Sequence, residues 1–417
     1  MELRKILSNG VEVIASTNPH LHSFCATVRV RAGSAYEKLP EHGITHLMEH
    51  CVLRGLKGRF DEDYYVLQSR SGVRFDARTN PVRTEYEVAG HPQGIPLAAE
   101  IIRKMFLPII LSPREFHLEK DRVLAEMARR TPGGYNDFIA GKTWEGTAAN
   151  RPVFGSAAKV RRFSRNQINA YRESILVPGN VQLCLTGCID EDELALLMDA
   201  AESIPMYGGQ PNPQELPRPK NFGKRELLLN GKVNFDYLQF IFDVDEEKCP
   251  RAVAELLREI LFRNDDALLY RQLSEKTGLV YNYDWSYLEY RGFGITEFGF
   301  YYDFKRIGDV MEAVRCTMKR LADGEFDLSG KQFALRSEWE RGLDDPVLLN
   351  SRMLYNLDLS DTPEPPAWDK VTKEEVISGA RAMLDSGVIA FWHQAEWAEV
   401  AEALRPYFAL DETKPKG

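Results

Sequence analysis

The fold is decided by the segment FSRNQINAYRESILVPGNVQLCLTGCIDEDELALLMDAA, residues 163–201. It starts with a capping box of Ser164 and Gln167 and continues as a helix, a glycine turn, an apolar strand and an amphipathic helix. Half a chain further on, the segment VTKEEVISGARAMLDSGVIAFWHQAEWAEVAEALRPYF, residues 371–408, repeats this order behind a second capping box. We interpret the repeat as an internal duplication, although helix–strand–helix is a common order that can also recur by chance.

A duplication predicts two homologous domains. The stretch YGGQPNPQELPRPKNFGK, residues 207–224, is rich in proline and glycine and lies where a linker between them is expected. We therefore predict a first domain at residues 1–206 and a second at residues 225–417. In each half, strands are followed by helices and then by the repeated unit, an order typical of α+β domains with a mainly antiparallel sheet covered by helices. An Asn-Gly hairpin signal in ELRKILSNGVEVIAST, residues 2–17, supports an antiparallel start.

The composition is that of a folded globular protein. Hydrophobic residues make up 44% and charged residues 28% of the 417 residues, far from the composition of disordered chains. The net charge of -9 argues against nucleic acid as a partner. We find no signal peptide, no transit peptide and no apolar run of about 18 residues, so we expect a cytoplasmic protein without a membrane partner.

The cysteines show neither a disulfide framework nor a thiolate metal site. They are scattered without a C-x-x-C pair. Cys184 and Cys188 lie in one apparent strand, where residues four apart are separated by ~13 Å and cannot bridge. We interpret all six as small buried side chains: Cys25, Cys51, Cys184, Cys188, Cys249 and Cys316.

The candidate chemistry is concentrated in GITHLMEHCVLRG, residues 43–55, which holds two of the chain's eight histidines. His46 and His50 are four residues apart, so on a helix both imidazoles share one face and can reach a single zinc ion at ~2.0–2.1 Å. Glu49 flanks that face, where a base that takes a proton from water at the metal is needed. The alternative is a solvated helix face without function, in which the pattern arose by chance.

Two histidines make an incomplete site, because a catalytic zinc ion usually has three protein ligands. The strongest candidate segment for the third is LSPREFHLEKDRVLAEMARR, residues 111–130, in which Ser112 and Glu115 predict a capped helix start. Glu119 and Glu126 are seven residues apart on this helix and share a face. One can bind zinc while the other lies close to the site, and geometry alone does not choose between them.

The motif HLMEH, followed after 75 residues by Glu126, resembles the signature of the inverzincin metallopeptidases, the family of pitrilysin, insulin-degrading enzyme and the mitochondrial processing peptidases. The similarity extends to LSNGVEVIA, RAGSAYEKLPEHGITHLMEH, EKDRVLAEM, RPVFGSAAKV and, in the C-terminal half, LYRQLSEKTGLVYNY. The resemblance implies one zinc ion (Zn²⁺) per chain, bound by His46, His50 and Glu126. It also implies Glu49 as the catalytic base of peptide hydrolysis and Glu119 as the family's accessory glutamate.

The resemblance also implies substrate-binding residues. The segment SGVRFDARTNPVRTEYEV, residues 71–88, resembles the edge strand that pairs with an extended substrate, with Asp76 standing before Ala77 where the family usually has asparagine. An ordinary buried or edge strand is the alternative. In the C-terminal half, Tyr281 matches a substrate-holding tyrosine, but Ser274 occupies the position of its arginine partner.

The missing arginine bears on how the chain works. Arg271 lies one helical turn before Ser274, and its long side chain can reach along the same face. Short members of the family pair two such chains around a chamber, and some divide labour, so we expect a homodimer or a heterodimer whose partner supplies the Arg-Tyr pair. The leading hypothesis is a zinc endopeptidase acting on peptides or unfolded segments. The alternatives are a non-catalytic peptide-binding or assembly subunit of the same fold and a zinc hydrolase of another bond.

Overall fold

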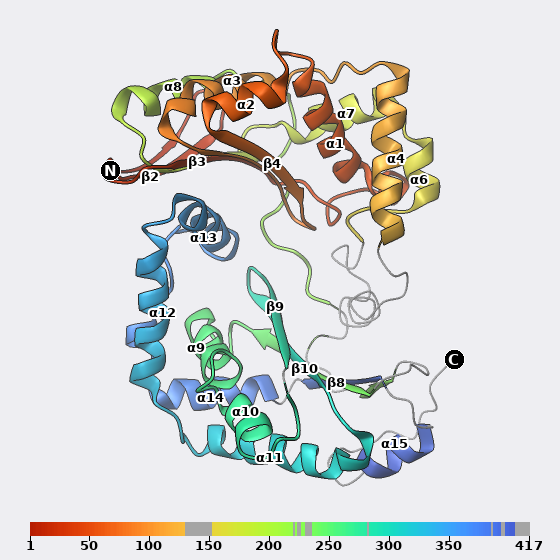
Figure 1. The fold of residues 1–417 in the computed structure, drawn as a ribbon, viewed down its shortest axis with the longest axis vertical. Helices are drawn as coiled ribbons and strands as arrows, with labels where there is room; N and C mark the ends of the chain where they lie inside the picture. The colour runs from red at the N-terminus through yellow and green to blue at the C-terminus, as the bar shows by residue number, and fades with distance from the viewer. Residues whose placement is uncertain are drawn as a thin grey trace. The chain divides into compact units, whose positions relative to one another are not determined.

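The computed structural model forms two compact units. It describes residues 1–129, 152–219, 222, 227–229, 236–281, 283–384, 387–392 and 397–404. The first unit comprises Met1–Pro217, Arg341–Leu357 and Asp361–Pro363, and the second comprises the remainder. Figure 1 shows the course of the chain, coloured by residue number. Among the described residues, no helix combines the length and the apolar character needed to cross a membrane.

A six-stranded sheet with the order β1-β2-β6-β3-β5-β4 forms the centre of the first unit. Neighbouring strands are antiparallel except for β2 and β6, which pair in parallel. The strands are β1 (Glu2–Ile6), β2 (Glu12–Thr17), β3 (Phe24–Val30), β4 (Val73–Thr79), β5 (Thr84–Gly90) and β6 (Val181–Gly187). The predicted hairpin is confirmed, since residues 7–11, which include Asn9 and Gly10, join β1 to β2, and Gly10 has a φ of +87° that favours glycine.

Helices cover one face of this sheet and close the core of the first unit. On β3, Phe24, Ala26, Val28 and Val30 point into that core, as the period of two in a strand requires. Figure 1 shows α2, α3 and α8 on this side of the sheet. The helices are α1 (Ile44–Lys57), α2 (Tyr64–Ser71), α3 (Ile95–Met105), α4 (Pro113–Arg129), α6 (Ala157–Arg162), α7 (Arg165–Ile175) and α8 (Glu191–Glu202), with short turns η1 (Leu39–Glu41) and η2 (Pro92–Gly94).

The opposite face of the sheet is covered by α13 (Pro346–Leu359), a helix from late in the sequence. Asn350 Nδ2 donates to the carbonyl oxygen of Cys184 at 3.0 Å, and Arg29 Nη1 donates to that of Leu354 at 2.6 Å. The sequence prediction assigned residues 225–417 to the second domain. The structure instead groups residues 341–357 with the first unit, because this sheet face carries polar side chains that α13 buries and bonds.

A five-stranded sheet with the order β7-β11-β8-β10-β9 forms the second unit, and its pairs are antiparallel except for β7 and β11. The strands are β7 (Leu227–Leu229), β8 (Tyr237–Asp245), β9 (Asp284–Tyr290), β10 (Phe293–Tyr301) and β11 (Gly387–Trp392). The helices are α9 (Arg251–Leu261), α10 (Leu268–Tyr270), α11 (Ile307–Ala322), α12 (Leu328–Gly342), α14 (Lys373–Leu384) and α15 (Trp397–Leu404), with η4 (Arg271–Glu275), η5 (Phe304–Arg306) and η6 (Trp368–Lys370). The core is built from β8, β10, α9, α11 and α14.

The two sheets match strand for strand once β1 is left out. The order β2-β6-β3-β5-β4 corresponds to β7-β11-β8-β10-β9, and the parallel pair occupies the same place in both. Both predicted capping boxes are present, one at Ser164 and Gln167 and the other at Thr372 and Glu375. The predicted α+β fold of two related domains is therefore confirmed. Residues 385, 386, 393–396 and 405–408 of the second repeat lie outside the described residues.

The predicted linker contains the point at which the two units divide, between Pro217 and Arg218. Its residues 207–219 form neither helix nor strand, and its residues 220, 221, 223 and 224 lie outside the described part of the chain.

The cysteines are all free thiols. Cys25, Cys51, Cys184 and Cys249 are buried, as predicted, whereas Cys188 and Cys316 are only partly buried. Cys188 differs because it follows β6 rather than lying within it, so it leaves the packed layer of the sheet. None of the six therefore contributes to a disulfide or to the candidate metal site.

Candidate metal centre

Helix α1 carries the H-x-x-E-H motif, and an unusual cap fixes its start. Gly43 precedes the helix with a φ of +96°, so its position offers no capping side chain. Instead, the buried carboxylate of Glu37 accepts hydrogen bonds from the backbone N–H of Gly43 at 2.8 Å and of Thr45 at 2.9 Å. A negative charge is favourable at this end of a helix. The apolar side chains that then anchor α1 in the core are Ile44, Leu47, Met48, Cys51, Val52 and Leu56.

Helix α4 supplies the two glutamates. Its predicted capping box is confirmed, because Ser112 N donates to Glu115 at 3.0 Å and Glu115 N donates to the Ser112 hydroxyl at 3.2 Å. Glu119 is buried, with 2% of its surface exposed, whereas the side chain of Glu126 is 46% exposed. Helices α1 and α4 pack against each other, so both carboxylates reach the histidine-bearing face of α1.

His46, His50 and Glu126 converge on one point. Each offers one ligand atom, and the three atoms lie within 4.8 Å of one another. Glu126 Oε2 lies 3.7 Å from His46 Nε2 and 3.6 Å from His50 Nε2. Tetrahedral bonds of ~2.0–2.1 Å would put ligand atoms ~3.4 Å apart, so these separations fit a single zinc ion. The donor set of two imidazole nitrogens and one carboxylate oxygen is also the set found at catalytic zinc sites.

The two imidazole rings are held in different ways. The ring of His46 packs edge-to-face against Phe154, with the ring centroids 4.5 Å apart. His50 Nδ1 lies 3.6 Å from Glu119 Oε2, on the side of the ring away from Glu126. Phe154 belongs to the RPVFG segment, which sequence analysis noted only as part of the resemblance. Each ring thus has a neighbour that is not a candidate ligand: Phe154 packs against His46, and Glu119 lies beside His50.

Glu119 is ionised beside the metal group. Burial alone would raise its pKa, but the neighbouring His50 ring and the charge of Arg122 outweigh burial and lower it below the ordinary value. Arg122 Nη1 donates to Glu119 Oε1 at 2.9 Å, and Arg54 Nε lies 3.8 Å from the same oxygen. The structure thus assigns Glu126 to the metal group and places Glu119 behind His50. The resemblance implied Glu126 as a ligand and Glu119 as an accessory glutamate, and these roles stay predictions.

Glu49 is buried beside the metal group but does not belong to it. The hydroxyl of Thr79 donates to Glu49 Oε2 at 2.5 Å. Burial raises the pKa of Glu49 above its ordinary value, and the hydrogen bond from Thr79 opposes that rise. One oxygen of Glu49 is thus held by the end of β4, and its role as a base stays a prediction. Sequence reasoning identified Glu49 but missed Thr79.

Asp76 and Ala77 lie on β4, which is an edge strand of the described sheet, as predicted. Asn80 N donates to Arg83 O, so these two residues form a hydrogen-bonded pair of the β4–β5 hairpin. Hydrogen-bonded and non-hydrogen-bonded pairs alternate along an antiparallel ladder, so the N–H of Ala77, three residues before Asn80, points away from β5 towards the open edge. The carboxylate of Asp76 accepts this N–H at 2.9 Å. In the described sheet, β4 thus has no neighbouring strand on its outer side at Ala77, and the outward N–H of Ala77 is bonded to the side chain of Asp76.

Tyr281, Ser274 and Arg271 all belong to the second unit. Tyr281 is 97% exposed. Arg271 begins the segment η4, which is a π-helix rather than the expected α-helix, so the offset from Arg271 to Ser274 is not that of an α-helical turn. The substrate-binding roles of these residues stay predictions.

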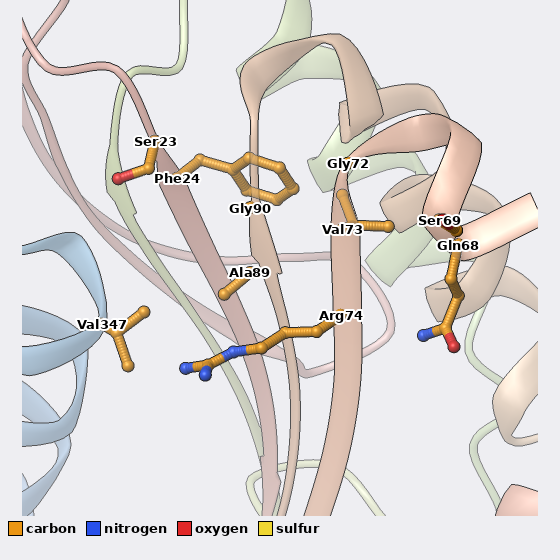
Figure 2. A pocket seen from close by; sticks show the side chains of 10 residues that line it. All are labelled: Ser23, Phe24, Gln68, Ser69, Gly72, Val73, Arg74, Ala89, Gly90 and Val347. Atoms are coloured by element: carbon orange, nitrogen blue, oxygen red, sulfur yellow. The ribbon is translucent and has the colours of Figure 1, made fainter. Parts of the chain in front are cut away.

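A separate cavity of about 420 Å³ lies at the other end of β4, in the first unit. Figure 2 shows its lining, in which the Arg74 side chain extends from β4 to the side on which Val347 lies. The lining residues are Ser23, Phe24, Gln68, Ser69, Gly72, Val73, Arg74, Ala89, Gly90 and Val347. No predicted site residue is among them. Thr79 ends β4 next to Glu49, whereas this cavity is formed where β4 begins.

Comparison with known proteins agrees with this geometry. The family model described as Insulinase (Peptidase family M16) matches residues 12–156. The model described as Peptidase M16 inactive domain matches residues 162–329. The chain belongs to peptidase family M16, so the suspected family is confirmed.

The relatives found by sequence include proteins named as zinc proteases. One from Streptomyces coelicolor is 22% identical over 293 residues, which are 67% of this chain and 63% of that protein. The mitochondrial-processing peptidase subunit beta of Bos taurus is 24% identical over 209 residues, 49% of this chain and 42% of that subunit. The matched segments span less than two thirds of either relative. A zinc protease of Bacillus subtilis is 21% identical, with 85% of this chain and 86% of that protein covered.

Solved structures share the fold over almost the whole chain. A protease from Helicobacter pylori has a TM-score of 0.80 at 15% identity and covers 94% of this chain and 99% of its own. The periplasmic protease PqqL of Escherichia coli has a TM-score of 0.79 at 14% identity and covers 99% of this chain and 51% of its own.

The second unit has lost the motif that the first unit keeps. Helix α9 is the first long helix after β8, as α1 is after β3, and its sequence RAVAELLREIL contains no histidine. Val253 and Leu257, four residues apart like His46 and His50, are buried in its core. Among the described residues, the group of potential metal ligands lies in the first unit.

Proposed function

We propose that this chain is a zinc endopeptidase that hydrolyses peptides or unfolded segments. The observation that carries the proposal is the convergence of His46, His50 and Glu126, with buried Glu49 beside them and outside their group. Each of the four residues comes from a rigid helix rather than a loop, which suits a site that must hold a metal and a base in fixed relation.

The residues of the chain divide the work of hydrolysis. A zinc ion held by His46, His50 and Glu126 would act as a Lewis acid on the scissile carbonyl and on water. Glu49 takes a proton from the attacking water and delivers it to the leaving amine. Glu119, whose Oε2 atom lies 3.6 Å from His50 Nδ1, holds the ring so that Nε2 faces the other candidate ligands.

The open edge of β4 is the proposed substrate surface. An extended peptide can add to an exposed edge through its backbone, so this surface accepts unfolded segments of varied sequence. To pair at Ala77, a substrate carbonyl must replace the carboxylate of Asp76, which now accepts that N–H. Asp76 therefore competes with the incoming strand and adds a negative charge beside it.

We also propose that the chain works as a dimer, as a homodimer or with a related chain, and that it is cytoplasmic. The relative named subunit beta is itself one part of an assembly. Ser274 in place of the family arginine supports a partner that contributes the Arg-Tyr pair, while Tyr281 remains in this chain. A non-catalytic peptide-binding or assembly subunit is the second candidate, favoured by the same Ser274 and by the absence of histidine from α9.

The deciding experiment measures bound zinc and cleavage of an unstructured peptide library by wild type and Glu49→Gln. It is run with and without the proteins encoded beside this chain. We expect near-stoichiometric zinc in both proteins and a loss of turnover of about 100-fold or more in Glu49→Gln. Protein purified without chelator that holds no zinc would contradict the proposal. Zinc with cleavage only beside a partner would support the heterodimer, and zinc without cleavage under any condition would support the non-catalytic subunit.

A further inference from the structure

We infer that Thr79 is a positioning residue that fixes the carboxylate of Glu49 and thereby selects which of its oxygens acts as the base. The inference rests on the proposed function. Thr79 lies 30 residues after Glu49, at the last paired position of β4, and its hydroxyl is 2.5 Å from Glu49 Oε2. The contact joins the base on α1 to the strand that forms the proposed substrate edge.

The Thr79 hydroxyl donates its hydrogen to Glu49. An ionised carboxylate only accepts, so Thr79 is the donor in this contact. The second polar neighbour of Thr79 is the Thr84 hydroxyl at 3.5 Å, which itself donates to the carbonyl oxygen of Ala32 at 3.0 Å. With its own hydrogen used there, the Thr84 oxygen is left only as an acceptor. The contact with Glu49 is 1 Å shorter than the contact with Thr84, so the Thr79 hydrogen points to Glu49.

The backbone holds Thr79 in place more firmly than a loop would. Thr79 pairs with Thr84, which is fully buried, and the two close the β4–β5 hairpin. The Thr84 hydroxyl in turn donates to the carbonyl oxygen of Ala32, so the pair of strands that carries Thr79 is itself anchored in the sheet. A side chain anchored on paired strands is better fixed than one on a mobile loop.

This arrangement leaves Oε1 as the working oxygen of Glu49. Oε2 accepts the short bond from Thr79, while among the described residues Oε1 receives no hydrogen bond. We therefore assign the proton taken from water to Oε1, and its later transfer to the leaving amine starts from the same atom. Because Ala77 presents the edge N–H two residues earlier on the same strand, a peptide bound to β4 would order the strand that also orients the base.

The test compares Thr79→Val, which keeps the shape but removes the hydroxyl, with Thr79→Ser, which keeps the hydroxyl. Thr17→Val, at the end of β2 and remote from the site, is the matched control. We expect Thr79→Val to lower kcat about 10- to 100-fold, with KM and zinc content changed less than about twofold. Thr79→Ser should recover kcat to within about threefold of wild type, and Thr17→Val should equal wild type.

A second measurement makes the inference independent of turnover. Crystal structures of zinc-loaded wild type and Thr79→Val should show the Glu49 carboxylate in one orientation in the former and rotated or in several orientations in the latter. An unchanged Glu49 in Thr79→Val, or a kcat equal to wild type, would overturn the inference. A wild-type protein that cleaves no peptide either alone or beside a partner would refute the proposed function, while the orientation of Glu49 in the two structures would still decide the role of Thr79.

Discussion

His50 lies between two carboxylates, with its Nδ1 atom 3.6 Å from Glu119 Oε2 and its Nε2 atom 3.6 Å from Glu126 Oε2. The two nitrogens therefore have different tasks. Nε2 faces the other candidate ligands, and Nδ1 faces the buried carboxylate of Glu119, whose pKa is lowered by His50 itself and by Arg122. A carboxylate on the far nitrogen fixes the tautomer and the ring orientation of a metal-binding histidine.

Glu119→Gln is expected to weaken zinc binding about 10- to 100-fold, because the amide is a poorer acceptor for His50 Nδ1–H and leaves the charge of Arg122 without its partner. Competition with a chromogenic chelator measures the affinity. The control is Asp121→Asn, an exposed carboxylate on the same helix, which should bind zinc as wild type does. An unchanged affinity in Glu119→Gln would show that Glu119 does not support His50.

Glu37→Ala is expected to destabilise the first unit by about 2 kcal/mol, because it leaves the N–H groups of Gly43 and Thr45 without their acceptor at a buried helix start. Urea unfolding of the metal-free protein measures the loss. Glu41→Ala, a partly exposed glutamate in the same loop, serves as the control and should change stability by less than about 0.5 kcal/mol. Equal stabilities for the two variants would argue against the cap.

The features that could be predicted from sequence are those whose partners are close in sequence. The Asn9-Gly10 turn and the capping boxes join residues within three positions, so their signals survive in any short window. The same holds for His46 and His50, whose helical spacing alone places both on one face. The third ligand needed the family resemblance, since two glutamates seven residues apart are equivalent in spacing.

What could not be predicted depends on contacts between distant residues. Thr79 reaches Glu49 across 30 positions, and no periodicity in either segment signals the contact. The return of α13 to the first sheet was hidden for a similar reason. The sheet face that α13 covers carries polar residues such as Arg29, which a pattern of alternating polarity would assign to solvent. The π-helix at residues 271–275 likewise has no marker in the sequence.

Glu85 should make the first unit sensitive to acid. It is buried on β5, with Arg78 Nε at 2.5 Å and Arg83 Nε at 2.9 Å. Burial raises its pKa, but the charges of Arg83, Arg78 and Arg29 outweigh burial and lower it below the ordinary value of 4.5. Because the folded state then binds the proton less tightly, the stabilisation is complete above pH 4.5 and is lost as the pH falls through the lowered pKa.

Glu85→Gln is accordingly expected to cost about 3 kcal/mol near pH 7 and to flatten the decline in stability at acid pH. Urea unfolding between about pH 3 and pH 7 measures both effects. Glu87→Gln is the matched control, because the pKa of Glu87 is shifted in the opposite direction to that of Glu85. Burial raises the pKa of Glu87 despite nearby Arg74. Its ionisation opposes folding, so its protonation at acid pH offsets part of the acid decline, and its removal should steepen that decline slightly. Parallel pH profiles for wild type and Glu85→Gln would contradict the assignment.

The first unit should not fold stably as residues 1–217 alone, because α13 would be missing from its sheet. In the part of α13 that belongs to the first unit, the buried leucine and methionine side chains are Leu349, Met353, Leu354 and Leu357. At about 1.5–3 kcal/mol each, their loss amounts to about 6 kcal/mol or more, comparable to the whole stability of an ordinary domain. The fragment would also expose Arg29 and the polar groups that Asn350 bonds.

A second fragment provides the control, in which residues 341–357 follow residue 217 through a flexible linker. We expect this fragment to melt cooperatively by circular dichroism and to resist limited proteolysis, whereas residues 1–217 alone should be digested rapidly and show no cooperative transition. Asn350→Leu in the linked fragment should lower its melting temperature, because it removes the donor to the Cys184 carbonyl. If residues 1–217 melt at the same temperature as the linked fragment, then α13 does not contribute to the stability of the first unit, and the prediction is wrong.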